Sequence, residues 1–220
     1  MMGNAVEIKN LFIAYEKNVI LRDFSLAVTS GEALLIQGPS GCGKSTLLHA
    51  VCGLIPKSIS AEISGEILLY SRNIRELSVV ERSREIGIVF QNPETQLFCD
   101  TVEDEIAFGL ENLCIPRMEI GQRIDEVLSL TRMEEYRLAS PKELSGGQKQ
   151  LVVLAAVLAL DPKILLLDEA LSQLDSIGRQ ALTQRLSELR HDGRTLLMVD
   201  HDGELASIAD RVVDWEEELA

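Results

Sequence analysis

A glycine-rich loop at residues 38–45 constrains this chain more than any other feature of its sequence. It reads Gly-Pro-Ser-Gly-Cys-Gly-Lys-Ser, which satisfies the pattern G-x-x-x-x-G-K-[ST]. The apolar run 34–37 precedes the loop and a helical pattern over 44–52 follows it, so the loop joins a buried strand to a helix. Successive backbone N–H groups of such a loop point inward around an anion, and the helix N-terminus adds positive potential. The loop therefore predicts a phosphate-binding site in an α/β fold.

The polar side chains of the loop suit a bound nucleoside triphosphate. Lys44 is predicted to reach the β- and γ-phosphates, and the Ser45 hydroxyl is predicted to ligate Mg²⁺. A chance match in a chain of this length is expected roughly 1% of the time, so nucleotide binding is favoured over an accidental turn. The rest of the loop is expected to contact the phosphates: Gly38, Pro39, Ser40, Gly41, Cys42, Gly43 and Thr46.

Two adjacent carboxylates follow a second apolar strand, 164–167. Asp168 at the end of that strand is predicted to orient Mg²⁺ beside the phosphate loop. Glu169 is predicted to polarise the attacking water as a general base. An Asp-Glu pair that only caps a helix is the alternative, and the presence of the phosphate loop argues against it.

Strands and helices alternate along most of the chain. The continuous apolar strands 86–90, 164–167 and 195–199 are typical of a parallel sheet covered on both faces, and helices over 145–160 and 176–189 lie between them. The first 70 residues contain short strands joined by turns. Residues 92–141 contain two helices and no strand, so we expect an inserted helical subdomain between core segments 1–91 and 142–220.

Acidic composition limits the partners of this chain. Asp and Glu number 35 against 21 Lys and Arg, which gives a formal net charge of −14. Proteins that bind nucleic acid or anionic lipid use a basic face, and this sequence predicts none. We therefore expect no nucleic-acid partner and no direct lipid binding, so that any membrane association runs through a protein partner.

The sequence also predicts a cytoplasmic chain. The longest apolar run, 151–160, is shorter than the roughly 20 residues that cross a bilayer. The first nine residues lack the basic start and apolar stretch of a signal peptide. The cysteines show neither C-x-x-C spacing nor clustered histidines, so we expect reduced thiols rather than a zinc site or disulfides: Cys42, Cys52, Cys99 and Cys114.

A third motif carries a family resemblance. Residues 144–148 read Leu-Ser-Gly-Gly-Gln, which resembles the signature sequence of ATP-binding cassette (ABC) ATPases, and the likeness extends over nearly the whole chain. The resemblance implies a P-loop NTPase (RecA-like) core with an antiparallel β subdomain and an inserted helical subdomain. It also implies that Mg²⁺ and ATP are sandwiched between two cassettes. In the family the signature of one subunit faces the γ-phosphate held by the other, which assigns that contact here to Ser145, Gly146, Gly147 and Gln148.

The resemblance assigns four further positions. Tyr15 corresponds to the aromatic residue that stacks on adenine, although an ordinary surface tyrosine would look the same. Gln91 corresponds to the Q-loop glutamine that contacts Mg²⁺ or water and senses the transporter. Residues 172–175 are similar to the D-loop, which places Asp175 across the dimer interface. His201 matches the switch histidine that bonds the γ-phosphate.

A narrower resemblance lies in residues 90–98 and 101–109. Phe-Gln-Asn-Pro-Glu-Thr-Gln-Leu-Phe and Thr-Val-Glu-Asp-Glu-Ile-Ala-Phe-Gly are similar to the Q-loop region of energy-coupling-factor (ECF) ATPases. Those ATPases drive uptake of vitamins and of cobalt or nickel ions. The resemblance implies a second ABC ATPase subunit, identical or related, and a transmembrane coupling protein that holds the chain on the inner face of the membrane. Leu97 and Phe98 are then candidates for the groove that receives a coupling helix.

Several features depart from the family pattern. Leu151, Ala170 and Asp200 stand where relatives often carry Arg, Pro and Thr or Ser, and none removes a group that does chemistry. ECF ATPases typically continue for several dozen residues after the position of Ala220, and that extension helps their cassettes associate. The resemblance therefore leaves open whether this chain dimerises alone.

Other functions fit less well. A non-transport ABC ATPase of DNA maintenance would carry a long coiled coil between the phosphate loop and the signature, and a binding-only regulator would lack Glu169 or His201. A P-loop kinase or GTPase would give residues 144–148 no role, and the Asn-Lys-x-Asp guanine motif does not occur. A transport ATPase is the preferred interpretation.

Overall fold

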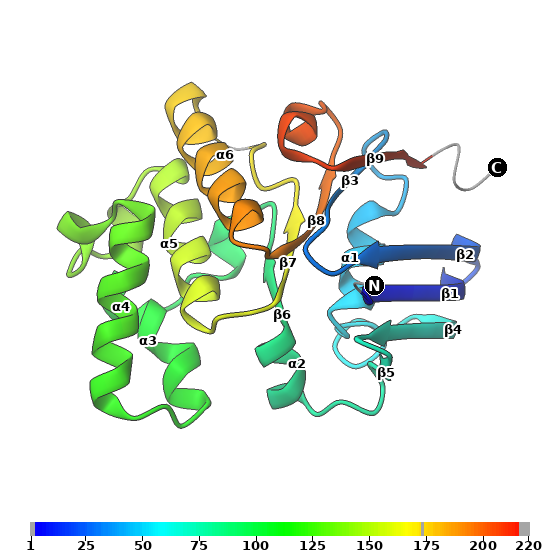
Figure 1. The fold of residues 1–220 in the computed structure, drawn as a ribbon, viewed down its shortest axis with the longest axis horizontal. Coiled ribbons are helices and arrows are strands. Elements are labelled where there is room, and N and C mark those ends of the chain that lie inside the picture. The colour runs from blue at the N-terminus through cyan, green and yellow to red at the C-terminus, as the bar shows by residue number, and fades with distance from the viewer. Residues whose placement is uncertain (1–2, 173, 216–220) are drawn as a thin grey trace.

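Two sheets and a group of helices form the molecule in the computed structural model, which describes residues 3–172 and 174–215 (Figure 1). The central sheet is parallel, with strand order β6-β7-β8-β3-β9. Its helices α1 and α6 follow the strands β3 and β7. The bounds are β3 Ala33–Gln37, α1 Lys44–Val51, β6 Ile86–Val89, β7 Ile164–Asp168, α6 Ser176–His191, β8 Thr195–Asp200 and β9 Arg211–Asp214.

The predicted antiparallel β subdomain is present as a second sheet. Its order is β2-β1-β4-β5, formed by β1 (Asn4–Tyr15), β2 (Asn18–Thr29), β4 (Glu62–Leu69) and β5 (Arg72–Asn73). The first two strands are much longer than the sequence analysis expected, because irregularities in register interrupt the alternation of buried and exposed residues along β1.

Helix α2 (Val79–Glu85) was missed by the sequence analysis. It begins with a capping box, in which the Ser78 hydroxyl accepts from the Glu81 N–H and the Glu81 carboxylate accepts from the Ser78 N–H. The Ser-x-x-Glu signal was therefore readable, although the helix is too short to show an apolar face. Strand β9 was missed as well, because it is a four-residue edge strand.

A helical layer occupies the end of the molecule opposite the antiparallel sheet (Figure 1). It contains α3 (Val102–Asn112), α4 (Arg117–Thr131) and α5 (Gly146–Ala159). Thr101 caps α3 through a hydrogen bond from the Asp104 N–H. The apolar cluster of this layer also includes Val152, Ala155 and Ala159 of α5. The boundaries 92 and 141 of a separate helical subdomain stay a prediction.

Successive residues of the parallel strands pack into two apolar cores, one on each face of the sheet. Leu34 and Ile36 pack with α1 and the antiparallel sheet, whereas Leu35 packs with α6 and the inner face of α5. This follows from the two-residue repeat of a strand, which sends successive side chains to opposite faces. Because all five strands are parallel, the loops after their carboxyl ends gather at one edge of the sheet. The start of the phosphate loop, Gln91, Glu169 and His201 lie in those loops.

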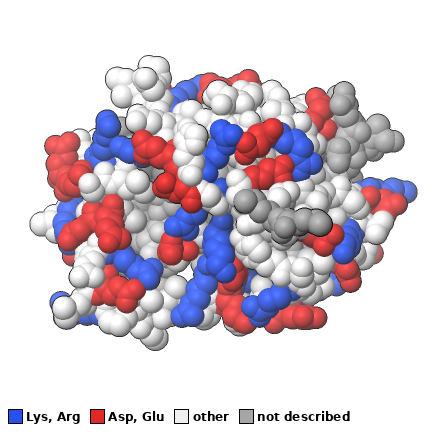
Figure 2. All heavy atoms as spheres, in the orientation of Figure 1, with Lys and Arg blue, Asp and Glu red and all other residues white. Residues whose placement is uncertain are grey.

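The surface carries both signs of charge. In the face shown in Figure 2, Lys and Arg side chains run in a narrow line through the middle, with Asp and Glu on both sides. Many basic side chains are in ion pairs, such as Arg194 with Asp161 and Lys163 with Glu85. Among the described residues, no helix is long and apolar enough to span a membrane.

Candidate nucleotide-binding site

The phosphate loop turns through glycines that adopt left-handed backbone angles. Gly41 has φ +80° and Gly43, the N-cap of α1, has φ +114°. The Lys44 side chain is 3% exposed, and its Nζ donates to the carbonyl oxygens of Gly38 and Pro39, both at 2.7 Å. The ammonium group is therefore held against the first two carbonyl groups of the loop. Its contact with the β- and γ-phosphates stays a prediction.

Ser45 and Asp168 meet beside this loop. The Ser45 hydroxyl donates to Asp168 Oδ1 at 2.7 Å. Asp168 is 5% exposed, and its burial raises the pKa of the carboxyl, against the opposing effects of the Ser45 hydrogen bond, His49 and Lys44. A hydroxyl and a buried carboxylate are hard oxygen ligands of the kind that Mg²⁺ prefers. The residues thus fit the predicted ion, although the described chain has no cluster of three or more His, Cys, Asp or Glu that could hold a metal.

Three predicted catalytic residues converge from three different loops. Glu169 follows β7, and its Oε2 accepts a hydrogen bond from Gln91 Nε2 at 2.8 Å. His201 Nδ1 lies 3.5 Å from the same oxygen. Glu169 has φ +45°, a conformation that costs energy in a residue other than glycine, and its N–H donates to the Val199 carbonyl at 3.1 Å. The backbone around Glu169 is thus strained and tied to β8, which aims the carboxylate at Gln91.

Asp200 explains one departure from the family pattern. It is 7% exposed, and its carboxylate accepts hydrogen bonds from the backbone N–H groups of His201, Asp202 and Glu204. The carboxylate therefore holds the loop that carries His201. His201 Nε2 also lies 3.1 Å from Asp202 Oδ2, so the imidazole is surrounded by acceptors on both nitrogens.

Two glutamines that the sequence analysis missed hold the start of the Q-loop. Gln96 Oε1 accepts from the Phe90 N–H at 2.8 Å, and its Nε2 donates to the Ile88 carbonyl at 3.0 Å. Gln150 on α5 donates to the Phe90 carbonyl at 3.1 Å. Both polar groups of the residue before Gln91 are therefore bound by side chains. The one sequence signal for Gln150 was its position as a polar residue next to the apolar stretch of α5.

The signature and D-loop residues lie at the starts of α5 and α6, outside the phosphate loop. Ser145 and Gln148 form a capping box at the start of α5, in the helical layer, while the phosphate loop follows β3 near the antiparallel sheet. Asp175 caps α6 by accepting from the Gly178 N–H at 2.8 Å. Both Ser145 and Asp175 are exposed. Gln173 of the predicted D-loop lies outside the described residues.

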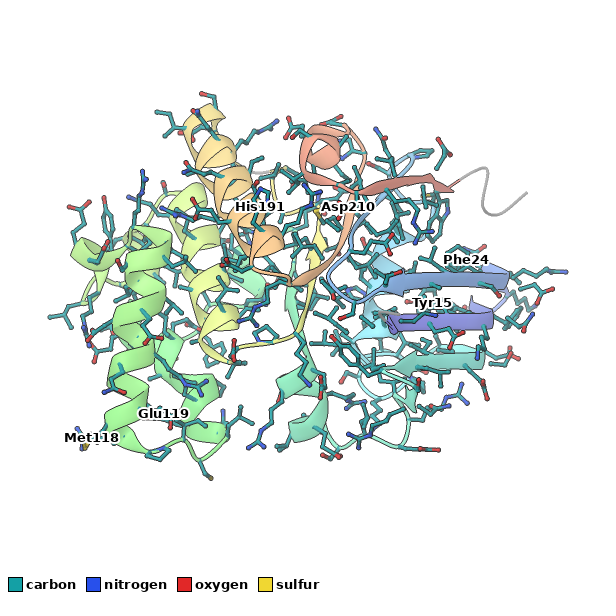
Figure 3. The ribbon with its side chains drawn as sticks, in the orientation of Figure 1. Tyr15, Phe24, Met118, Glu119, His191 and Asp210 are labelled. Atoms are coloured by element: carbon teal, nitrogen blue, oxygen red, sulfur yellow. The ribbon has the colours of Figure 1, made fainter. Side chains whose placement is uncertain are left out.

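Tyr15 ends β1 and is half-buried against the apolar core that also receives Cys42 of the phosphate loop (Figure 3). Its predicted contact with adenine stays a prediction.

A groove borders the Q-loop. Its lining includes Leu97, Phe98 and Lys149, and its cavity volume is about 280 Å³. Phe98 is 62% exposed, and its ring stands edge-on to Phe108 at 4.7 Å between centroids. Lys149 pairs with Glu94 at 2.6 Å, which ties the Q-loop to α5.

Comparison with known proteins decides the family. Residues 21–172 match the family model of the ABC transporter. This chain belongs to the ABC transporter family. Its parallel core and antiparallel sheet form the fold of the ATP-hydrolysing cassettes of that family, to which the structures below also belong.

Curated relatives of this ABC protein cover almost all of the chain. The energy-coupling factor transporter ATP-binding protein EcfA1 of Leuconostoc mesenteroides is 40% identical over 96% of this chain and 77% of the relative. A protein of Methanosarcina acetivorans with a provisional name as an ABC transporter ATP-binding protein is 43% identical over 94% of this chain. The chain spans only 33% and 36% of the length of that protein and of its Methanosarcina mazei counterpart.

Solved ABC structures superpose closely. CbiO1 from Clostridium perfringens, described as part of the ABC transporter complex CbiONQ, has a TM-score of 0.85 and 31% identity over 96% of this chain and 84% of that one. The ATP-binding cassette MJ0796, a dimer bound to ADP and Pi in a post-hydrolysis state, has a TM-score of 0.83 and 29% identity over 95% of this chain and 93% of that one.

Proposed function

We propose that this ABC protein is the ATP-hydrolysing subunit of a membrane transporter, of the energy-coupling-factor type that takes up a vitamin or a metal ion. The observation that carries the proposal is the meeting of Gln91 and Glu169 at 2.8 Å beside the bonded pair Ser45–Asp168. This arrangement supports a role for Glu169 as a general base next to the phosphate loop, a group that a binding-only regulator does not need. The likeness to EcfA1 and CbiO1 supports the transporter type.

Each residue has a chemical role in the proposed reaction. Glu169 accepts the proton of the attacking water, and Gln91 orients that carboxylate. Lys44 and His201 stabilise the negative charge that develops on the γ-phosphate. Ser45, Asp168 and Gln91 would hold Mg²⁺, which supplies further charge stabilisation when bound.

The site is proposed to be completed by a second cassette, identical or related. Ser145 and Asp175 are exposed and lie at the starts of two helices, α5 and α6. In one chain the signature is in the helical layer, at a distance from the phosphate loop along the fold. Closure of two cassettes would bring the signature of one onto the γ-phosphate held by the other.

A Glu169→Gln variant tests the proposed function. Blocking hydrolysis should trap a closed sandwich, so light scattering is expected to show a shift from monomer to dimer only with Mg-ATP. Lys44→Ala in the same background is the control, because it removes the phosphate contact and should abolish the shift. ATP binding without dimerisation would make a second cassette or a membrane partner obligatory, and absence of ATP binding would refute the proposal.

The transmembrane partner is proposed to dock at the groove beside the Q-loop, which would hold the chain on the cytoplasmic face of the membrane. Phe98→Asp is expected to lower the fraction of the chain that sediments with membranes of its host by about tenfold, since burying a charge in an apolar contact is costly. Met118→Asp is the matched control, because Met118 is 84% exposed on α4 and does not line this groove. An equal loss for both variants would contradict docking at the groove.

A further inference from the structure

Trp215 lies directly beneath the phosphate loop. It follows β9, whose last residue, Asp214, pairs with Gln37 of β3 in parallel register. The next residues of the two strands, Trp215 and Gly38, therefore leave the sheet side by side. Trp215 is 1% exposed although it is the largest side chain in the molecule. The single tryptophan of the sequence is thus buried where the loop begins.

The loop touches the indole at both of its ends. A Cβ atom on Gly38 would lie 2.7 Å from Trp215 Cβ, which no real contact allows. A Cβ atom on Gly43 would lie 3.2 Å from Trp215 Cζ2 and 2.5 Å from Ile20 Cγ2. Gly38 is therefore needed for the close approach of Trp215. Gly43 is needed for its left-handed backbone angle and for the close approach of Ile20 and Trp215.

The indole also makes a directed polar contact. Trp215 Nε1 donates to the carbonyl oxygen of Cys42 at 3.0 Å. Cys42 O and the Gly43 N–H belong to one peptide unit, and in a planar trans peptide the C=O and N–H bonds point in opposite directions. Because the carbonyl is held toward the indole, the Gly43 N–H is turned away from it, toward the concave side of the loop. This is the orientation that an anion-binding loop requires.

We propose that Trp215 is a positioning residue for phosphate binding, which acts by fixing the Cys42–Gly43 peptide so that its N–H faces the bound phosphate. This inference rests on the proposed nucleotide-binding function of the same loop. Phe24 of β2 supports the indole from another side, with ring centroids 5.6 Å apart and planes tilted by 32°. Phe24 thus contributes packing to Trp215, while only the indole N–H contacts the loop carbonyl.

Two replacements separate the hydrogen bond from packing. Trp215→Phe keeps an aromatic ring and removes the donor. Replacing Trp215 by benzothienylalanine keeps the size of the bicyclic ring, with sulfur in place of N–H, and so guards against a folding defect. Phe24→Leu is the matched control, because it trims packing against the indole and leaves the bond to Cys42 in place.

Calorimetric titration with Mg-ADP and with Mg-pyrophosphate provides the readout, since neither probe needs turnover. Both donor-lacking variants are expected to raise Kd about fivefold for each probe, the factor that one ordinary hydrogen bond is worth. The equal loss for pyrophosphate is the specific signature, because a general change of the nucleotide site would also alter adenosine contacts. Phe24→Leu is expected to lower the melting temperature with Kd unchanged.

Two results in the variants would overturn the inference. An unchanged Kd in the benzothienylalanine protein would show that the indole N–H is not needed for binding. An equal rise of Kd in Phe24→Leu would show that Trp215 acts through packing alone. Wild-type protein that binds Mg-pyrophosphate but no Mg-ADP would contradict the proposed function and leave the inference standing. Wild-type protein that binds neither probe would refute both.

Discussion

Replacing Gln96 by leucine should weaken both the fold and the catalysis of this ABC protein. The side chain makes two hydrogen bonds to the backbone, one from the Phe90 N–H and one to the Ile88 carbonyl. Exchanging the oxygen and nitrogen of the Gln96 amide would break both hydrogen bonds at once, so only this amide orientation pairs the two backbone groups. Leucine has a similar size and leaves the donor of Phe90 and the acceptor of Ile88 without their partner.

The magnitude follows from those two contacts. An unpaired buried polar group costs about 1–3 kcal/mol, and both groups here are half-buried, so that water replaces part of the loss. We expect Gln96→Leu to lower the free energy of unfolding by about 2–3 kcal/mol, which corresponds to a melting temperature lower by about 4–10 °C. Denaturant unfolding measures the first value and calorimetry the second. Gln184→Leu on α6, an exposed glutamine, is the matched control and should change little.

The same change should slow hydrolysis through Gln91. Phe90 directly precedes Gln91, whose Nε2 contacts Glu169. Because Gln96 holds the Phe90 backbone, its loss would leave the position of Gln91 relative to Glu169 less well fixed. We expect kcat to fall about tenfold at a temperature where the variant is fully folded, since a small misplacement of a catalytic contact has effects of this order. In a Gln91→Ala background the Gln96→Leu change should have almost no further effect on kcat. A further tenfold fall in that background, or unchanged stability of the single variant, would refute the reasoning.

Two other substitutions test the electrostatics of the described residues. Asp168→Asn should lower the rate of ATP hydrolysis about 100-fold or more. The same change should raise the melting temperature of the nucleotide-free protein, because burial raises the pKa of the Asp168 carboxyl and thus disfavours its charged form in the fold. A lower melting temperature would contradict this reasoning. Asp210 pairs with Arg190 and accepts from the Ala33 N–H, so the pKa of its carboxyl lies below the ordinary value of 3.8. The stability that a depressed pKa adds is fully present above pH 3.8 and is lost as the pH falls below that value. Asp210→Asn should therefore lower the free energy of unfolding by about 0.5–1 kcal/mol at pH 7 and leave it unchanged in strong acid. Urea unfolding at the two pH values measures both effects.

Much of the candidate site could be predicted because its signals are local. The phosphate loop needs glycine at positions with left-handed backbone angles, and Gly41 and Gly43 adopt them. The capping box at Ser145 and the N-cap at Asp175 also depend on residues within one helical turn. Such features depend on neighbours along the chain, so a short pattern of residues is enough to reveal them.

Other parts could not be predicted, because their partners are distant in sequence. Gln150 meets Phe90 across 60 positions, and Asp200 binds a loop whose residues carry no capping pattern. Strand β9 was missed for a related reason, since its four residues are held by pairing with β3 rather than shown by their own periodicity. Helix α2 was missed although its capping box is a local signal, because seven residues are too few to show an apolar face.

The amino-acid sequence by itself determined that this chain has an α/β core, a phosphate-binding loop and the residues Asp168, Glu169 and His201 at strand ends. Only the tertiary structure decided which of them touch. It joined Gln91 to Glu169 and placed Trp215 beneath Cys42, contacts that span 78 and 173 positions. The physical reason is that backbone conformation responds to adjacent residues, whereas side-chain contacts between loops depend on the order and register of the parallel strands that carry them.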